Sequence, residues 1–301
     1  MIGLQNFFKY FFKLFLSEDT KIRIEKTIFV IAIASFLIHL LVIGLVDFGF
    51  LNIIDPDKLL TNPIAALYTP FSFILVYEVY LLIYYLPKSI TIYIGKQYEI
   101  ITLILIRRIF KDLAALELTP NWFHVREDLA FTYDILTTIV LFFLIWVFYT
   151  LVDKKKDLVP SKSFESPEKS QFIKMKNIIA TVLVPIFFSV AIYSLLTWTQ
   201  SLVAAGPENA EKITNINNVF FDSFFTILIL SDVLLLLVSF QRTDRFSTVI
   251  RNSGFIISTI LIKMSFSTAG PINNLLIITA VLYGVTILYI HNKYYKLPYS
   301  S

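Results

Sequence analysis

Ionisable side chains lie inside apolar stretches of this chain that are long enough to cross a membrane. Asp232, for example, stands within the apolar run 227–238, far from either end of it. A charge placed in hydrocarbon costs about 2.5–3.5 kcal/mol on insertion scales, so it normally faces a partner, a cavity or a pathway. Carboxylates and imidazoles in such positions can exchange protons, and nearby cations can pair with them. These residues are the first indication of function.

The composition sets the class of protein. Hydrophobic residues make up 56% of the 301 positions, whereas a soluble domain has about 45–50%. The excess is concentrated in blocks, which indicates an integral membrane protein. The net charge of +4 comes from basic residues beside the apolar blocks, where they orient spans, so no nucleic-acid partner is expected. The chain has no cysteine, which excludes disulfides, Cys-ligated clusters and thiol catalysis.

The hydropathy pattern predicts an all-α, polytopic membrane protein with about eight transmembrane helices in two four-helix halves. Each span covers roughly 30 Å at about 1.5 Å per residue. Pro70 and Pro185 fall inside spans and are expected to kink them. Seven spans are clear, at residues 28–46, 64–86, 131–152, 177–198, 219–240, 247–267 and 271–290.

The eighth span follows from the distribution of basic residues. Lysines near the N-terminus and seven lysines in segment 153–176 place both regions on the inner side. An even number of spans must then lie between them, so residues 89–110 are predicted to cross despite Lys96 and Glu99. In the alternative, residues 88–116 lie along the inner membrane surface.

These assignments divide the chain into four parts. Residues 1–26 form an N-terminal amphipathic segment, in which Phe alternates with Lys and a helix would rest at the membrane interface. A soluble amphipathic helix packed on the protein is the alternative. The two halves, 27–152 and 177–301, are joined by the basic cytoplasmic connector 153–176. Both termini are expected in the cytoplasm, and the cell (inner) membrane is the expected location.

Depth along the helices predicts a charged cluster in the first half. Glu78 and Lys96 both lie about 12 Å above the inner boundary, on consecutive helices, so an ion pair is expected. Glu99 lies one turn higher, at the level of His39. The four side chains could form an ion or proton pathway or its gate. The alternative is that such pairs only hold helices together.

The second half carries a similar candidate, Asp232 with Arg251, as a further part of the pathway or gate. Pairs nearer the outer surface are predicted to be structural. Arg107 and Arg108 close one span where Asp134 opens the next, and Asp222 lies at the depth of Lys263.

No motif for catalysis or for a resident metal or cofactor is present. The sequence lacks the zinc, nucleophile-elbow and phosphate-loop patterns, so the protein is expected not to be an enzyme. The leading hypothesis is a membrane protein that conducts or gates a small inorganic ion or a proton, in contact with the lipid bilayer and as a homo-oligomer if it is a channel. The alternatives are a membrane anchor or scaffold that recruits a cytoplasmic partner, and a proton-coupled transporter of a small solute.

Overall fold

The residues that the structure describes are almost all helical and include no strand, as the sequence predicts. These residues are 10–50, 63–113, 116, 126–156, 167–205, 216–240, 246–266, 268 and 270–294 of a computed structural model. A short helix covers residues 10–16. The elements that follow are α2 (Glu18–Asp47), η1 (a 3-10 helix, Pro63–Leu67), α3 (Tyr68–Tyr85), α4 (Ile90–Leu113), α5 (Arg126–Lys156), α6 (Pro167–Ala205), α7 (Ile216–Phe240), α8 (Phe246–Ser265) and α9 (Pro271–Tyr294).

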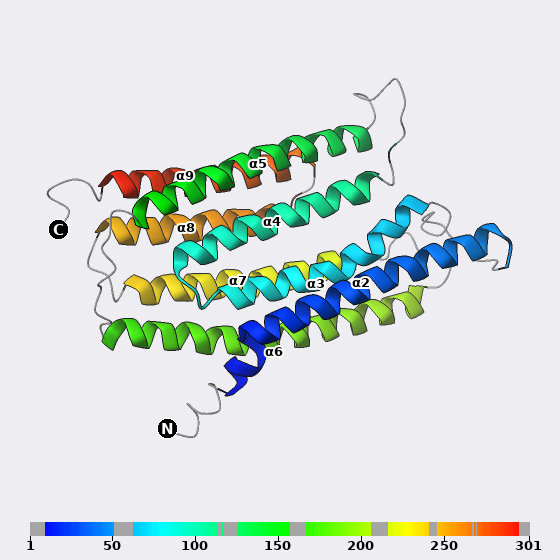
Figure 1. Ribbon diagram of the computed structural model, residues 1–301, viewed down its shortest axis with the longest axis horizontal. Helices are drawn as coiled ribbons and strands as arrows, with labels where there is room; N and C mark the ends of the chain where they lie inside the picture. Colours follow the sequence, from blue (N-terminus) through cyan, green and yellow to red (C-terminus); the bar gives the residue numbers. More distant parts are fainter. Residues whose placement is uncertain are drawn as a thin grey trace.

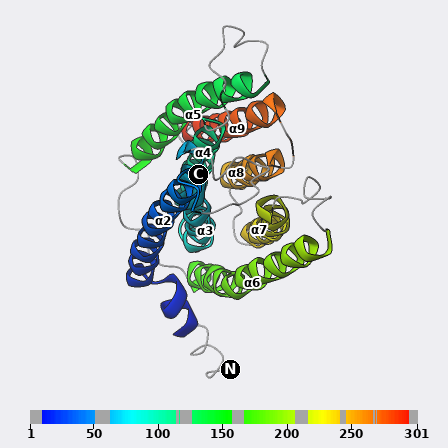
Figure 2. The same ribbon diagram turned by 90° about the vertical axis from the view of Figure 1, so that its right-hand side faces the viewer.

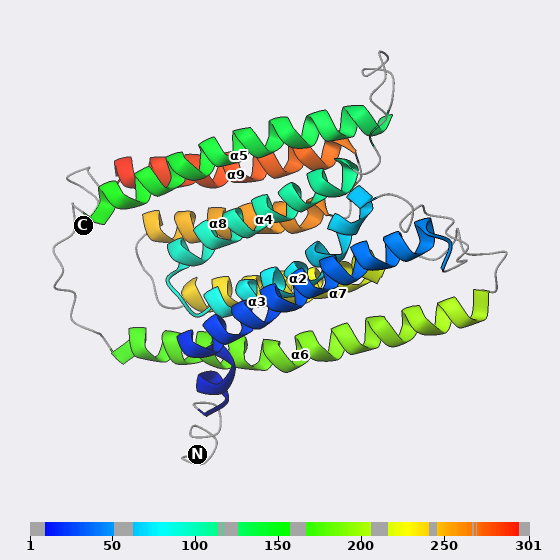
Figure 3. The same ribbon diagram turned by 45° about the vertical axis from the view of Figure 1, so that its right-hand side comes forward.

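The long helices lie side by side with their axes roughly aligned (Figures 1 and 3). Along the chain, α2 packs on α3, α3 on α4 and α4 on α5, and the same order recurs from α6 to α9. Seen along the helices, α2 to α5 form one row and α6 to α9 form a second row beside it (Figure 2). The main contacts between the two rows join α5 to α9, α4 to α8 and α3 to α6. Consecutive helices run in opposite directions. The end of α5, the start of α6 and the end of α9 therefore lie at one end of the bundle (left in Figure 1). It is called the inner end below, after the side on which the sequence predicts it to lie.

Five of the described helices are long and apolar enough to cross a membrane, namely α2, α5, α6, α7 and α9. The apolar part of α3 is shorter. The protein therefore has the features of an integral membrane protein. The most apolar stretch of α2 is only 11% buried inside the bundle, which leaves most of its surface free to face lipid.

The helices α4 and α8 do not meet the same test, and their positions explain why. They contact each other in the middle of the bundle, and both have neighbours on their other sides (Figure 2). The polar side of α8 faces the interior of the bundle, where four of its side chains are buried: Asn252, Ser258, Thr259 and Lys263. On α4, Gln97 is 2% exposed. A helix side that other helices shield from lipid can carry polar residues, so the low hydropathy of α8 reflects its buried polar side. On α4, the partly exposed pair Lys96 and Glu99 also lowers the hydropathy.

Local chemistry sets where several helices begin. The Ser17 side chain accepts a hydrogen bond from the Thr20 backbone N–H at 3.2 Å and caps α2. Residues 18–26, predicted as part of the N-terminal segment, therefore belong to α2. Pro70 falls in the first turn of α3, directly after η1, where a missing N–H costs little, so it lies at the start of that helix and not within its middle. Pro185 does lie inside its helix, α6.

The N-terminal helix is tied to the inner end of α3. The hydroxyl of Tyr80 donates to the backbone oxygen of Phe15 at 2.8 Å, and that of Tyr84 donates to Glu18. Residues 10–16 therefore pack on the bundle at the level where α3 turns into α4. The first nine residues of the predicted interfacial segment lie outside the described part of the chain.

Candidate functional site

The most deeply buried charge pair in the described residues joins α7 to α8 in the middle of the bundle. Lys263 Nζ donates to Asp232 Oδ2 at 2.5 Å, and the two side chains are 2% and 0% exposed. The hydroxyl of Tyr93, on α4, donates to Asp232 Oδ1 at 2.8 Å. Thr259 adds a longer contact of 3.4 Å to Oδ2. Both oxygens of one carboxylate are thus held by donors from two neighbouring helices.

The sequence builds this cluster by helical spacing. Thr259 and Lys263 are four residues apart, so they lie on the same face of α8. That face meets α7 at Asp232, which stands in an otherwise apolar helix. Tyr93 lies in the first turn of α4 and reaches the same carboxylate from the other row of helices, α2 to α5. The cluster therefore forms only when α4, α7 and α8 come together.

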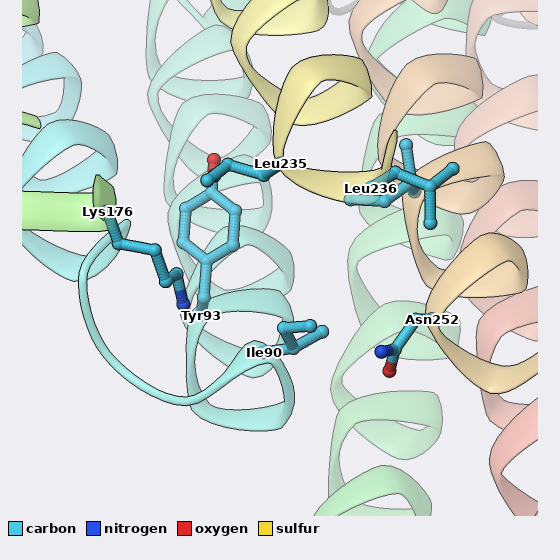
Figure 4. A pocket seen from close by; sticks show the side chains of 7 residues that line it. Ile90, Tyr93, Lys176, Leu235, Leu236 and Asn252 are labelled. Carbon is cyan, nitrogen blue, oxygen red and sulfur yellow. The ribbon is translucent and has the colours of Figure 1, made fainter. Parts of the chain in front are cut away.

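A small cavity lies on the inner side of this cluster (Figure 4). Its lining includes Tyr93, Lys176 and Asn252, with apolar side chains from α7. The volume in which the centre of a water molecule fits is about 20 Å³, which is enough for one buried water. The Lys176 side chain reaches toward Tyr93 in Figure 4, and its Nζ donates to the backbone oxygen of Lys88. A second ammonium therefore lies beneath the Asp232 cluster.

Polar side chains continue from the cavity to the inner end. Asn252 donates to Ser239 Oγ at 3.0 Å and accepts from Arg251, whose other guanidinium nitrogen lies 3.4 Å from Nε2 of His291. His291 in turn contacts the backbone oxygen of Ser247 at 3.0 Å. These contacts connect α7, α8 and α9 at the inner end of the bundle.

A second network lies at the outer end, joining α4, α5 and α9. Arg108 forms an ion pair with Asp134 through both oxygens of the carboxylate and also donates to Asn273 and Asn274. Asn274 donates to Asp134 Oδ1 at 2.7 Å. Asn273 donates to the backbone oxygen of Ser265, which lies two residues after Lys263 on α8. Asp134 is thus paired with the basic end of α4, but through Arg108 and not through Arg107 as predicted, because Arg107 contacts Glu78.

Along α8, hydrogen-bonding groups therefore follow one another from Arg251 to Ser265, a length of about 21 Å at 1.5 Å per residue. The inner contacts, the cavity, the Asp232 cluster and the outer network lie in that order. We call this series of side chains the polar line. The Asp232 cluster thus lies between a polar network at each end of the bundle.

Two ion pairs predicted among the pathway residues are wrong. Glu78 does not pair with Lys96: its Oε2 lies 3.4 Å from Nη1 of Arg107, and Lys96 instead contacts Glu99 on its own helix at 2.6 Å. Asp232 pairs with Lys263, whereas Arg251 points away toward the inner end.

The remaining predicted residues are not brought together in one cluster. His39 contacts Thr69, at the start of α3, and Glu99 contacts Tyr149 of α5. The four-residue cluster expected in the first half is therefore not formed. Lys263 is occupied by Asp232, which contradicts its predicted pairing with Asp222, whose side chain lies outside the described part of the structure.

Sequence reasoning missed Tyr93, Lys176, Asn252, Asn273 and Asn274. Lys176 is the last residue of the predicted connector 153–176, and the asparagines carry no charge that would mark them within an apolar span. One signal was available for α8: its polar residues recur on one face of a helix that is apolar elsewhere, which in a membrane protein points to a buried polar face. Tyr93 carries no comparable signal, because tyrosine is frequent throughout the chain.

The described residues contain no group of three or more His, Asp or Glu side chains that could hold a metal ion. The chain matches no protein-family model, no curated protein and no solved structure. The function must therefore be argued from the geometry alone.

Proposed function

We propose that the protein carries protons across a membrane, or gates their flow, along the polar line. The observation that supports this most strongly is the Asp232 carboxylate, fully buried and held by Tyr93 and Lys263. Ionisable groups at such depth are costly, and proton relays are among their main uses in membranes. The proposal requires α2 to α9 to cross the membrane as eight spans, in two rows of four helices, with both termini on the cytoplasmic side.

The size of the cavity favours a proton over a larger ion. A hydrated metal cation needs a continuous wide path, whereas a proton needs only a chain of donors and acceptors. The space beside Tyr93 suits one water. The ammonium groups of Lys176 and Lys263 on either side of Asp232 would also repel a metal cation.

The Asp232–Lys263 pair supplies the means of coupling proton binding to movement. A proton that arrives from the water beside Tyr93 would neutralise the carboxylate of Asp232. Lys263 would then be a buried ammonium without its counter-charge, a state that costs several kcal/mol. The cost favours a rearrangement of α8 against α7, and release of the proton toward the outer network restores the pair.

Proton flux in proteoliposomes tests this proposal. A potassium diffusion potential drives protons inward, and a trapped pH-sensitive dye reports them. Asp232→Asn should lose most of the flux, because an amide does not titrate. Glu99→Gln is the matched control: it makes the same chemical change on the surface of α4, away from the polar line, and should keep the flux. Wild-type flux in folded Asp232→Asn, or loss of flux only in Glu99→Gln, would refute the proposal.

A proton-coupled carrier of a small solute is the second candidate, and one pocket favours it. The pocket lies at the inner end, between the N-terminal helix, the turn from α3 to α4 and the start of α6, and offers about 230 Å³. Its lining mixes the rings of Phe12 and Tyr84 with the charges of Glu18 and Lys88. A carrier would show saturable solute uptake driven by a proton gradient, whereas a simple proton pathway would not.

A further inference from the structure

One charged pair at membrane depth lies on the outside of the bundle. Lys96 Nζ contacts Glu99 Oε2 at 2.6 Å, and the side chains are 33% and 35% exposed. By contrast, Asp232 and Lys263 are almost completely buried. The position of the exposed pair is fixed by its neighbours: Tyr149 donates to Glu99 Oε1 at 2.5 Å, and Lys96 Nζ lies 5.7 Å from the centre of the Tyr85 ring.

The surface around this pair is apolar and belongs to one face of α4. Ile92, Leu103 and Phe110 are exposed, and their spacing places them on the same side of the helix as Lys96 and Glu99. We call these five residues the α4 stripe. Lys96 and Glu99 lie about 9 Å and about 14 Å from the start of α4 along its axis, so lipid tails would contact them.

A face of this kind is unfavourable against lipid. A charge in hydrocarbon is unfavourable, and a partly exposed pair keeps part of that cost. Arg108 is similarly exposed, at 33%, but it lies near the outer end of α4 and is held by Asp134 and two asparagines. The α4 stripe is thus a surface on which a partner of matching charge would relieve an exposed pair.

We propose that the partner is a second copy of this chain, packed stripe to stripe about a two-fold axis along the membrane normal. In such a dimer the two α4 helices are parallel and their residues lie at equal depths. Lys96 of one copy would then reach the partner subunit's Glu99, which is only about 4.5 Å higher, within the length of a lysine side chain. The symmetry repeats the contact, so two ion pairs form from one self-complementary patch.

Charge exchange tests this dimer without relying on one variant. In Lys96→Glu every copy carries two acidic residues on the stripe, and in Glu99→Lys every copy carries two basic ones. Each variant alone should dimerise more weakly than wild type by roughly tenfold or more, because like charges across an interface cost several kcal/mol. Mixed together, the two variants should form a heterodimer, since each supplies the charge that the other lacks.

Subunit counting by single-molecule photobleaching in liposomes, at several protein-to-lipid ratios, measures both results. Failure of the mixture to recover dimers, while both variants elute as folded protein, would overturn the proposal and leave the pair to a structural role within one copy. A monomeric wild type at every ratio would overturn it as well.

Cross-linking gives a second measurement that leaves the charges intact. Because the chain has no cysteine, a single cysteine at Leu103 reports its own contacts. Leu103→Cys should form a disulfide between copies in the membrane. The control is Leu230→Cys, which is also exposed, at 64%, but lies on α7. Cross-linking of both variants, or of neither, would contradict the proposed interface.

Discussion

Replacement of Lys263 by methionine is the perturbation that examines the central cluster most closely. Methionine has a similar length and no charge, so the variant keeps the volume of the side chain and removes only the ammonium. Asp232 would keep the hydrogen bonds from Tyr93 and Thr259 but lose its ion pair. Because the carboxylate is 0% exposed, bulk solvent cannot replace the lost partner.

The size of the effect follows from burial. Breaking a buried ion pair by removing one partner costs about 3–5 kcal/mol. Replacing both partners by apolar residues removes both charges, so Asp232→Leu with Lys263→Met leaves mainly the Tyr93 hydroxyl without an acceptor, at about 1–3 kcal/mol. The double variant should therefore be more stable than Lys263→Met alone by roughly 2 kcal/mol. Adding Tyr93→Phe should bring the stability close to that of wild type.

Unfolding by SDS in mixed micelles, followed by tryptophan fluorescence, measures these differences. Lys293→Met is the control, because Lys293 is exposed at the end of α9 and its loss should change the unfolding free energy by less than about 0.5 kcal/mol. If the costs of Asp232→Leu and Lys263→Met simply add, the two side chains are not coupled and the cluster described here is incorrect.

Three further changes probe capping and packing in the bundle, and SDS unfolding measures each. Ser17→Ala should cost about 1 kcal/mol, because the N-cap of α2 is lost; an unchanged midpoint would contradict the capping. Gly284→Ala should be strongly destabilising, since its Cβ would lie 1.9 Å from the Tyr98 hydroxyl oxygen, and adding Tyr98→Phe should partly rescue it. Arg108→Lys should destabilise the outer end, because an ammonium cannot hold both oxygens of Asp134 as the guanidinium does; wild-type stability would show that the network contributes little.

Much of the fold could be predicted from hydropathy and charge. The apolar stretches mark the positions of the long helices, and counting inner-side lysines was enough to expect a helix at residues 89–110. The polar character of α4 made that helix ambiguous, because hydropathy treats every helix as if it faced lipid. Which helices pack beside α4 depends on tertiary contacts, and the residues of α4 alone do not identify them.

The two wrong ion pairs among the pathway residues have a common physical cause. Side chains on a helix lean toward its N-terminus, so on antiparallel neighbours they lean toward opposite ends of the bundle. Lys263 and Arg107 lie near the outer ends of α8 and α4, and lean inward to reach carboxylates that lie deeper. Arg251 leans in the same direction and so moves away from Asp232. Depth counted at the backbone missed these shifts.

Helix face was the other missing quantity. Lys96 and Glu78 are close in depth, but Lys96 lies on the exposed side of α4, whereas Glu78 is 2% exposed. Depth alone could not separate these two orientations. The face of a helix that turns inward depends on all of its neighbours, which only the assembled bundle defines.

The polar line crosses the membrane only if α4 does, and accessibility labelling tests that most directly. The chain has no native cysteine, so Ser89→Cys and Leu113→Cys place one label site just before α4 and one at its end. In sealed vesicles with the outer face outward, a membrane-impermeant maleimide should label Leu113→Cys at once and Ser89→Cys only after lysis. Equal labelling of the two sites, or equal protection, would place both ends of α4 on the same side and contradict the account.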